Sequence, residues 1–445
     1  MLVRRLSDNR TEWSISLSVH RAADPLSTGG ARPAVDRRWS AWFLSRMTAI
    51  AFGGLAIALV RGNVFYDTVY YAHWAHGTLT GARVPYRDFA WEYPPGVLPA
   101  MLVPGIFAPL LQDGHGSLYV FVYGALWVLL MLAVDALVLR WLLRLTHAEP
   151  GHPATRLWLW GLPLLGALTW ARFDLLPAAA ASVAMLAAAT GTYRRAGTWG
   201  GVGAALKLWP ALLAPVQRSR SSALKAVART AAVVGGTAAL TLALTGSTGY
   251  GQVLSYQSRR GLQCESLAAL PFLWIRHLAG TGYRMRLRFG AWEVVGPHIG
   301  LICAAATGVY TVGLIGLAVI HWRFLRRDVG PELIALSAVA LALLTLCTDK
   351  VLSPQYLLWL LAIMAAAAVV DAATWGPYVP WTALACALSA VVFPWFYGDV
   401  LQTGWLGLLA LTARDLVLLG MAVAVARRLV HQLRVDARGH RVRSS

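Results

Sequence analysis

Long apolar runs separated by short arginine blocks constrain this chain more than any other feature. The 445 residues are 58% hydrophobic and 13% charged, and several apolar runs reach the roughly 20 residues that cross a bilayer as an α-helix. Backbone groups in lipid must be hydrogen bonded within the spanning segment, so these runs predict helices. Because alternating segments of the membrane β-barrel type are absent from the sequence, we predict an all-α polytopic membrane protein.

The arginine blocks predict the orientation of the spans, since cytoplasmic loops of membrane proteins carry an excess of Lys and Arg. The same pattern accounts for the net charge of +19, so we expect no nucleic-acid partner. Both termini are predicted to be cytoplasmic, and the two long polar loops, 61–117 and 246–297, to be external. The predicted full spans are 42–60, 118–144, 157–171, 175–192, 228–245, 298–320, 331–347, 356–371, 380–395 and 405–426.

Two apolar segments do not fit as simple crossings. Segment 94–112 contains five prolines, and a crossing there would invert every later arginine block; we predict a surface or re-entrant helix on the outer side. Segment 199–216 has arginine at both ends, which favours a hairpin or two half-spans that meet near residues 207–210. The total is then ten transmembrane helices, or twelve if the hairpin counts as two.

The chain ends are polar and basic. Residues 1–40 are rich in Arg and Ser with no apolar core, which predicts a disordered cytoplasmic segment, followed by a signal-anchor near Ala41 rather than a cleavable signal. Residues 41–426 form the predicted transmembrane domain, and 427–445 a basic cytoplasmic tail. The cysteines are far apart and show no metal-binding spacing or disulfide framework. They are Cys264, Cys303, Cys347 and Cys386.

The first external loop is the most polar and aromatic part of the chain. Asp67 lies just past the first span, where it is either a general base for an acceptor hydroxyl or the N-cap of a helix over 68–79. Glu92 is a candidate to bind sugar or metal, or to pair with a nearby arginine. Tyr71 and Trp91 either stack on a sugar ring or belong to an interfacial aromatic belt.

Further charged residues lie at the predicted outer side, where so many cations beside a bilayer suggest a bound phosphate. Arg259 and Arg260 are candidates to clamp it, with Glu265 orienting them; the alternative is a solvated, self-paired surface helix. Lys207 is a candidate site residue or snorkels to the inner surface. Three charged residues lie inside spans, where we expect packing or interhelical pairing and not catalysis: Asp135, Arg414 and Asp415. The remaining site candidates are Arg172, Asp174, Lys350, Gln355 and Tyr356.

The first-loop pattern resembles that of the GT-C glycosyltransferases. The residues that carry the likeness are Asp67, Gly81, Pro85, Tyr86, Phe89, Trp91, Glu92, Tyr93, Pro94 and Pro95. Four later stretches resemble glycosyltransferase family 87, the polyprenyl-phosphate-mannose-dependent α-mannosyltransferases. They are Arg172 to Pro177, Leu206 to Pro210, Arg260 to Ser266 and Lys350 to Tyr356. The resemblance runs from about residue 42 to residue 426.

The resemblance implies a GT-C fold and an inverting transfer of a hexose, as mannose, from a polyprenyl-phosphate sugar to a glycolipid or glycan acceptor. It implies a site at the outer face of a bacterial plasma membrane, with Asp67 as the general base and no nucleotide or other cofactor. Glu92 is not part of an Asp-x-Asp or Glu-x-Asp motif, so we expect no metal. The alternatives are an arabinofuranosyltransferase of the same fold, a carrier of lipid-linked sugars and a non-catalytic assembly subunit. The carrier should show inverted repeats, which we do not find.

Overall fold

The computed structural model describes residues 31–60, 63–110, 116–280, 282–326 and 328–444. The chain divides into a unit of residues 1–40 and a unit of residues 41–445, and the second unit carries the membrane helices and the site candidates. Most of the predicted disordered N-terminus, residues 1–30, lies outside the described residues. Helix α1 (Ala31–Val60) begins ahead of the predicted start near Ala41, because the apolar run extends its helix into the preceding Ala- and Arg-containing sequence.

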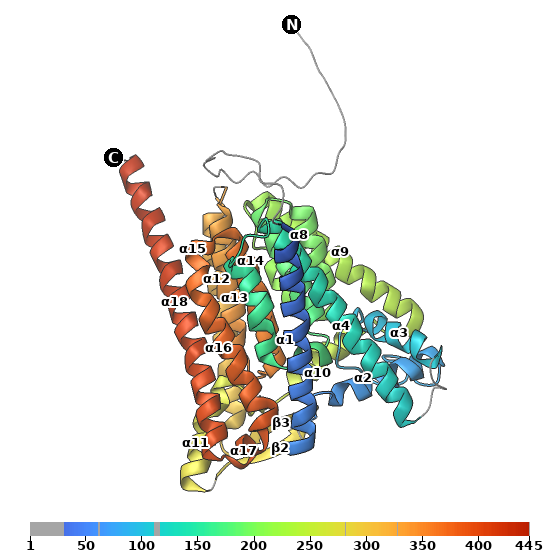
Figure 1. Cartoon of the computed structure of the whole chain (residues 1–445). Coiled ribbons are helices and arrows are strands. Elements are labelled where there is room, and N and C mark those ends of the chain that lie inside the picture. The colour runs from blue at the N-terminus through green and yellow to red at the C-terminus, as the bar shows by residue number, and fades with distance from the viewer. Residues whose placement is uncertain (1–30, 61–62, 111–115, 281, 327, 445) are drawn as a thin grey trace. The chain divides into compact units, whose positions relative to one another are not determined.

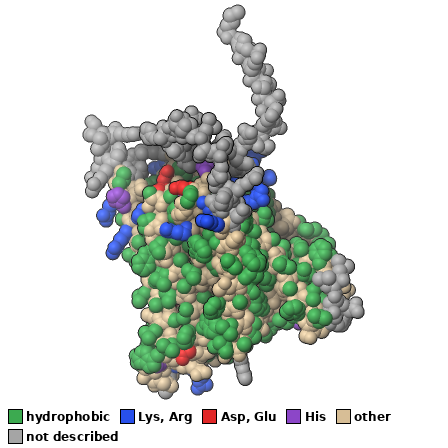
Figure 2. All heavy atoms as spheres, in the orientation of Figure 1, with side chains coloured by type: hydrophobic (Ala, Val, Ile, Leu, Met, Phe, Trp, Pro, Cys, Tyr) green, Lys and Arg blue, Asp and Glu red, His purple; other side chains and the backbone are tan. Residues whose placement is uncertain are grey.

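The fold is an all-α polytopic membrane fold, as predicted (Figure 1). In the part of the chain that the structure describes, seven helical segments are long and apolar enough to span a membrane. Figure 2 shows hydrophobic side chains over much of the visible helical surface, with most of the visible Lys and Arg near one end. The seven segments are Arg37–Val60 of α1, α4 (Ser117–Leu145), α9 (Arg220–Thr245), α12 (Ile299–Phe324), α13 (Pro331–Thr348), Ala372–Trp395 around α16 (Val379–Ala390), and Trp405–Val435 of α18 (Trp405–Ser444).

The other three predicted spans are short or interrupted. Segment 157–171 is a series of short turns from α5 (Pro153–Arg156) to α6 (Leu168–Ala171), broken at Gly166, which has a φ of +77°. The other two become α7 (Leu175–Ala189) and α14 (Leu357–Val370), whose residues are almost all buried. These two helices pack against each other, since their many alanines let the backbones approach closely.

The segment over 199–216 is a hairpin, as the flanking arginines indicated. Helix α8 (Tyr193–Leu206) ends at Lys207, whose backbone is extended, and the short helix η4 (Trp209–Leu213) leads back. A Cβ atom on Gly191 would lie 3.5 Å from Cδ of Arg218, so the chain enters and leaves at the same level. Lys207 therefore lies at the tip of the hairpin.

The Pro-rich segment after the first loop forms only α3 (Val97–Phe107), 11 residues long with Pro104 inside it. That length is about half of what a crossing requires, which agrees with the predicted surface or re-entrant helix. It packs against α2 (Tyr66–Leu79), where a Cβ on Gly105 would lie only 2.9 Å from Cβ of Ala75. Glycine is required there for the two helices to approach.

The arginine blocks between helices gather at one end of the helices. Nε of Arg218 donates to the Val329 carbonyl at 3.0 Å, and the imidazole of His321 contacts both Ser337 Oγ at 2.9 Å and the Gln217 carbonyl at 3.1 Å. Helix α13 starts beside this cluster and ends at Thr348, just before Asp349. The polar residues predicted to be external consequently lie at the opposite ends of the helices.

The second long loop contains a small antiparallel sheet that the sequence analysis did not predict. Its strands are β1 (Leu262–Gln263), β2 (Arg284–Arg288) and β3 (Ala291–Val295), in the order β1-β3-β2. Helices α10 (Tyr250–Arg259) and α11 (Leu270–Ala279) flank it. One face of the sheet packs on an apolar cluster that includes Leu262 and Val294, which attaches the loop to α12 and α18.

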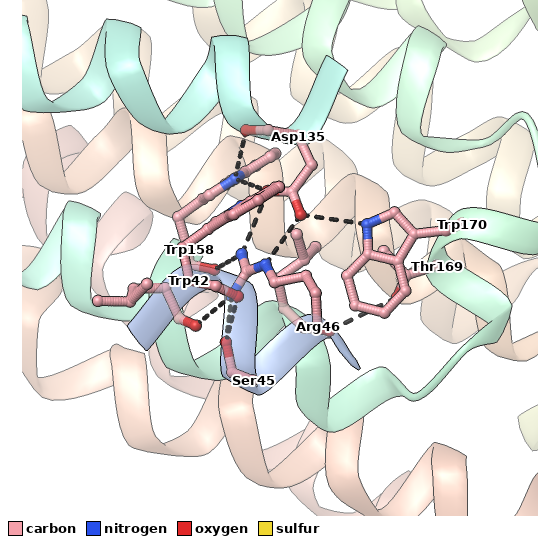
Figure 3. A network of polar contacts seen from close by, with 9 residues as sticks. Trp42, Ser45, Arg46, Asp135, Trp158, Thr169 and Trp170 are labelled. Carbon is pink, nitrogen blue, oxygen red and sulfur yellow. Dashed lines mark hydrogen bonds and ion pairs between the residues drawn. The ribbon is translucent and has the colours of Figure 1, made fainter. Parts of the chain in front are cut away.

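Arg46 and Asp135 form a fully buried ion pair between α1 and α4, which confirms the predicted pairing of Asp135 (Figure 3). Nε and Nη2 of Arg46 lie 2.9 and 3.1 Å from the two carboxylate oxygens. The indole N–H groups of Trp158 and Trp170 donate to the same carboxylate at 2.8 and 3.1 Å. Both oxygens of Asp135 are thus compensated, as a charge in the membrane interior requires.

Candidate active site

Asp67 is paired with Arg172. Helix α2 begins at Tyr66 with Phe65 at its N-cap, so Asp67 lies inside the first turn and does not cap the helix, which removes the capping alternative. Its carboxylate forms an ion pair with Nη1 of Arg172, both side chains being about four-fifths buried. A carboxylate in a first turn is also stabilised by the helix dipole. Asp67 is therefore held as a carboxylate beside the polar end of α7.

Arg172 is the cation at the centre of the candidate site. Its backbone is extended between α6 and α7, and burial lowers the pKa of its guanidinium to about 10, which leaves it charged at neutral pH. The negative charges of Asp174 and Glu265 raise the pKa of Arg172 and so oppose this effect of burial. Among the described residues, its Nε has no hydrogen-bond partner. Arg172 therefore retains an unused donor toward several acidic groups.

Lys207, at the tip of the hairpin, is bound to Asp174. Its Nζ lies 2.6 Å from Oδ1 of Asp174, which also accepts from the indole N–H of Trp359 at 3.0 Å. The ammonium lies over the rings of Tyr356 and Trp359, 4.3 and 4.9 Å from their centroids. These contacts rule out snorkelling to the inner surface. They join the hairpin to the starts of α7 and α14.

Arg260 faces two carboxylates that come from distant parts of the chain. Burial raises the pKa of Glu92, and a hydrogen bond from Tyr256 and the charge of Arg260 oppose that rise. Burial likewise raises the pKa of Asp349, and Arg260, Lys350 and Lys207 oppose it. The buried Nε of Arg260 has no hydrogen-bond partner within the described part of the chain.

Arg259, in contrast, points away from these groups. It is exposed at the last turn of α10, and its Nε donates to the Ser255 carbonyl at 3.1 Å. The chain becomes extended at Arg260, so consecutive side chains point in different directions. The structure thus separates the two arginines that the sequence analysis grouped as one clamp.

Glu265 connects this region to α18. Arg414, fully buried in α18, lies with Nη1 3.7 Å from Oε1 of Glu265, donates through Nη2 to the Glu265 carbonyl, and pairs with Asp415 at 2.8 Å. Burial raises the pKa of Glu265 to about 7, and the charges of Arg414 and Arg172 oppose that rise. Glu265 therefore lies between a buried arginine and the site arginine.

The aromatic residues of the first loop form a buried cluster. Tyr71 and Trp91 are 0% and 1% exposed, which excludes an interfacial belt for these two, whereas Tyr66 and Tyr70 are exposed. The ring of Tyr93 lies 4.9 Å from that of Phe173 and 5.6 Å from that of Trp91. Phe173 lies between Arg172 and Asp174 in the sequence, so the cluster packs directly behind the charged groups.

The last candidates belong to the segment after α13. Lys350 donates from Nζ to the Ser258 carbonyl at 3.3 Å, and its own carbonyl accepts from Gln263 N–H at 3.0 Å. Tyr356 is buried over Lys207, and Gln355 is half-buried beside it. This segment therefore joins α10 and β1 to the hairpin tip.

The family model for glycosyltransferase family 87 matches residues 91–348, more than half of the chain. The chain belongs to glycosyltransferase family 87. It is a membrane glycosyltransferase, and the sugar donor and acceptor that such an enzyme requires are its substrates. The matched region contains Glu92, Arg172, Lys207, Arg260 and Glu265 and leaves out Asp67 and the segment after α13. A comparison with curated proteins gave no match.

The structure of this family 87 enzyme adds site residues that the sequence analysis missed. Trp359 and Tyr397 come from ordinary apolar or aromatic sequence, and only the folded chain brings them to Asp174 and Arg172. The sequence did indicate a buried contact for Arg414, because an arginine within an apolar run must find a partner. Its pairing was predicted, but its partner Glu265 was not.

We expect the Glu265→Gln variant to change how stability depends on pH. The pKa of Glu265 is about 7 in the folded protein against an ordinary value of 4.5, so the folded state holds this proton more tightly. That contribution to stability is complete below pH 4.5 and is lost as the pH rises through 7. Between pH 4.5 and 8 the parent should therefore lose about 3 kcal/mol of unfolding free energy that the variant does not lose. The measurement is detergent-induced unfolding of both proteins across this pH range.

The matched control is Glu149→Gln, at an exposed glutamate in the loop after α4. The difference in unfolding free energy between this control and the parent should stay constant over the same pH range. If the Glu265→Gln difference is equally constant, the raised pKa of Glu265 is wrong.

Proposed function

We propose that this family 87 enzyme transfers a hexose, mannose, from a polyprenyl-phosphate sugar to a glycolipid or glycan acceptor. We place the reaction at the outer face of the bacterial plasma membrane, with both termini cytoplasmic. The observation that carries the proposal is that Arg172 and Arg260 each have a buried Nε that no described residue binds, and that each lies beside carboxylates at the helix ends opposite the arginine blocks. Guanidinium groups bind phosphate oxygens in bidentate fashion.

In the proposed step, Asp67 takes the proton of the acceptor hydroxyl as that oxygen attacks the anomeric carbon. The bond from the anomeric carbon to the phosphate oxygen breaks, and its electron pair leaves with the polyprenyl phosphate. Attack from the side opposite the leaving group inverts the anomeric centre. Arg260 and Arg172 stabilise the negative charge that grows on the phosphate, and Glu92 borders the sugar.

Arg172 has two roles in the proposed reaction. In the structure it neutralises Asp67, and with the donor bound its free Nε faces the phosphate. Lys207 and Asp174 neutralise each other, so we assign them to positioning of the α7 start. Arg259, exposed and turned away, is left out of the phosphate site.

The test is transfer by the purified chain in proteoliposomes. Labelled polyprenyl-phosphate mannose should yield a labelled acceptor and free polyprenyl phosphate, whereas a nucleotide-linked mannose should yield none. Polyprenyl-phosphate glucose and arabinofuranose test the choice of sugar. Movement of the donor across the bilayer without release of polyprenyl phosphate, or transfer from the nucleotide sugar alone, would refute the proposal.

Arg260 and Arg259 provide a matched pair of variants for the same assay. Arg260→Gln should lower kcat/KM for the lipid donor about 10²-fold, because a charged donor to the leaving phosphate is lost. Arg259→Gln, with the same loss of charge one residue away, should stay within about twofold of the parent, as exposed surface substitutions do. Equal losses in both variants would show that net charge at this surface, and not a phosphate contact, is responsible.

A further inference from the structure

Strand β2 carries three arginines on one face. Residues 284–288 alternate Arg284, Met285, Arg286, Leu287, Arg288, and the period of two in a strand places the arginines on one face and the apolar residues on the other. The strand turns back into β3 through Phe289 and Gly290, both with positive φ, as a two-residue hairpin turn requires. The hairpin is therefore tight, and its two faces differ sharply in chemistry.

Pairing within the sheet defines where each face points. Met285 lies opposite Val294, which lies opposite Leu262, and this row packs on the apolar core. Arg286 lies opposite Glu293, which lies opposite Gln263. The arginine face is thus turned away from the core, and all three arginines are exposed.

These arginines form no ion pair with any carboxylate of the described residues. Glu293, the acid directly opposite Arg286, is buried and accepts from the Gly261 N–H through Oε1 at 2.7 Å. Within the described ranges, no ion pair includes Arg284, Arg286 or Arg288. Arg288 lies over the neighbouring Phe289 ring, 5.0 Å from its centroid. Three cations on an exposed face are thus left without a described internal anion.

The hairpin is attached directly to a membrane span. Strand β3 ends at Val295, and α12, which has no buried residue in its most apolar window, begins at Ile299. Strand β2 follows α11, whose Leu278 is 73% exposed, and Leu287 beside the arginines is 58% exposed. Exposed apolar groups next to cations are typical of chain segments at the headgroup level of a bilayer.

We propose that the arginine face of β2 binds the anionic head groups of membrane phospholipids. The phosphate group of such a lipid supplies an anion to these side chains, and the guanidinium group suits phosphate geometry. Cationic side chains within about a Debye length of a surface that carries anionic lipid are attracted to that surface. Lipid bound there fixes the sheet that carries Gln263 and Glu293 at the membrane surface.

The test counts lipid bound to the detergent-purified full chain by native mass spectrometry, with phosphatidylglycerol as the anionic lipid and phosphatidylcholine as the neutral one. The parent should prefer phosphatidylglycerol. The triple substitution R284Q/R286Q/R288Q should weaken the tightest phosphatidylglycerol site by about 100-fold, since each arginine contributes on the order of fivefold. The matched control R284K/R286K/R288K keeps the charge and should retain most of the preference.

Two results would overturn the proposal. Unchanged phosphatidylglycerol binding in the triple glutamine variant would show that the lipid binds elsewhere; if that variant also dimerises, the arginines serve to keep an edge strand from pairing. Displacement of the lipid by millimolar inorganic phosphate would show a phosphate site with no preference for lipid. Because binding is read without turnover, failure here leaves the proposed transferase activity untouched.

Discussion

The Asp67→Asn variant should fold normally and lose sugar transfer, with kcat lowered by about 10²- to 10⁴-fold. Asparagine keeps the shape of the side chain and its place in the first turn of α2 but cannot accept a proton from the acceptor hydroxyl. Because the change acts on the chemical step, donor KM should change far less than kcat. The measurement is steady-state transfer from polyprenyl-phosphate mannose in proteoliposomes, beside thermal unfolding to verify the fold.

The control for this variant is Asp88→Asn, on the same loop. Asp88 forms an exposed ion pair with Arg87 at 2.9 Å, and exposed pairs contribute little. Its kcat should remain close to that of the parent. Turnover at the parent rate in Asp67→Asn would remove Asp67 from the mechanism and leave its pair with Arg172 as a structural contact.

The Arg46→Met variant should be the most destabilised single substitution, by about 3–5 kcal/mol. It leaves Asp135 with no counter-ion in a fully buried position, where only the indole N–H groups of Trp158 and Trp170 remain. The loss is read as the change in unfolding free energy during detergent-induced unfolding.

Two further variants show whether the buried pair itself is responsible. The double substitution Arg46→Met with Asp135→Leu removes both charges and should recover most of the loss, because the uncompensated charge is gone. Arg87→Met breaks an exposed pair and should leave the unfolding free energy close to that of the parent. If the double variant is as unstable as Arg46→Met, lost packing and not the unpaired carboxylate explains the effect.

The membrane fold was predictable because the physical constraint on a span is local. About 20 apolar residues in a row specify a helix, and α4, α12 and α13 follow the predicted limits closely. Helix α9 ends as predicted but begins at Arg220, eight residues before the predicted start at 228. Helices α7 and α14 are shorter than about 20 residues because protein surrounds them. A helix covered by its neighbours does not need to match the bilayer thickness. The hairpin tip at Lys207 was predictable from the arginines at both ends of the segment.

The geometry of the site was much less accessible from the sequence. Arg259 and Arg260 read alike, and only the end of α10 turns one outward and the other toward Glu92. The alternation of arginine with apolar residues over 284–288 is a strand signal, yet these residues were predicted only as part of an external polar loop. Asp135 was expected to pair, but its partner lies 89 positions away, a separation that no local pattern encodes.

Arg172 and Asp174 are separated by one residue, yet they pair with partners on different parts of the chain, Asp67 on α2 and Lys207 at the hairpin tip. A displacement of this tripeptide therefore moves both ion pairs at once. Asp67 and the tip of the 199–216 hairpin therefore cannot change position independently. Substitutions that relocate one will persist in evolution only together with compensating changes at the other.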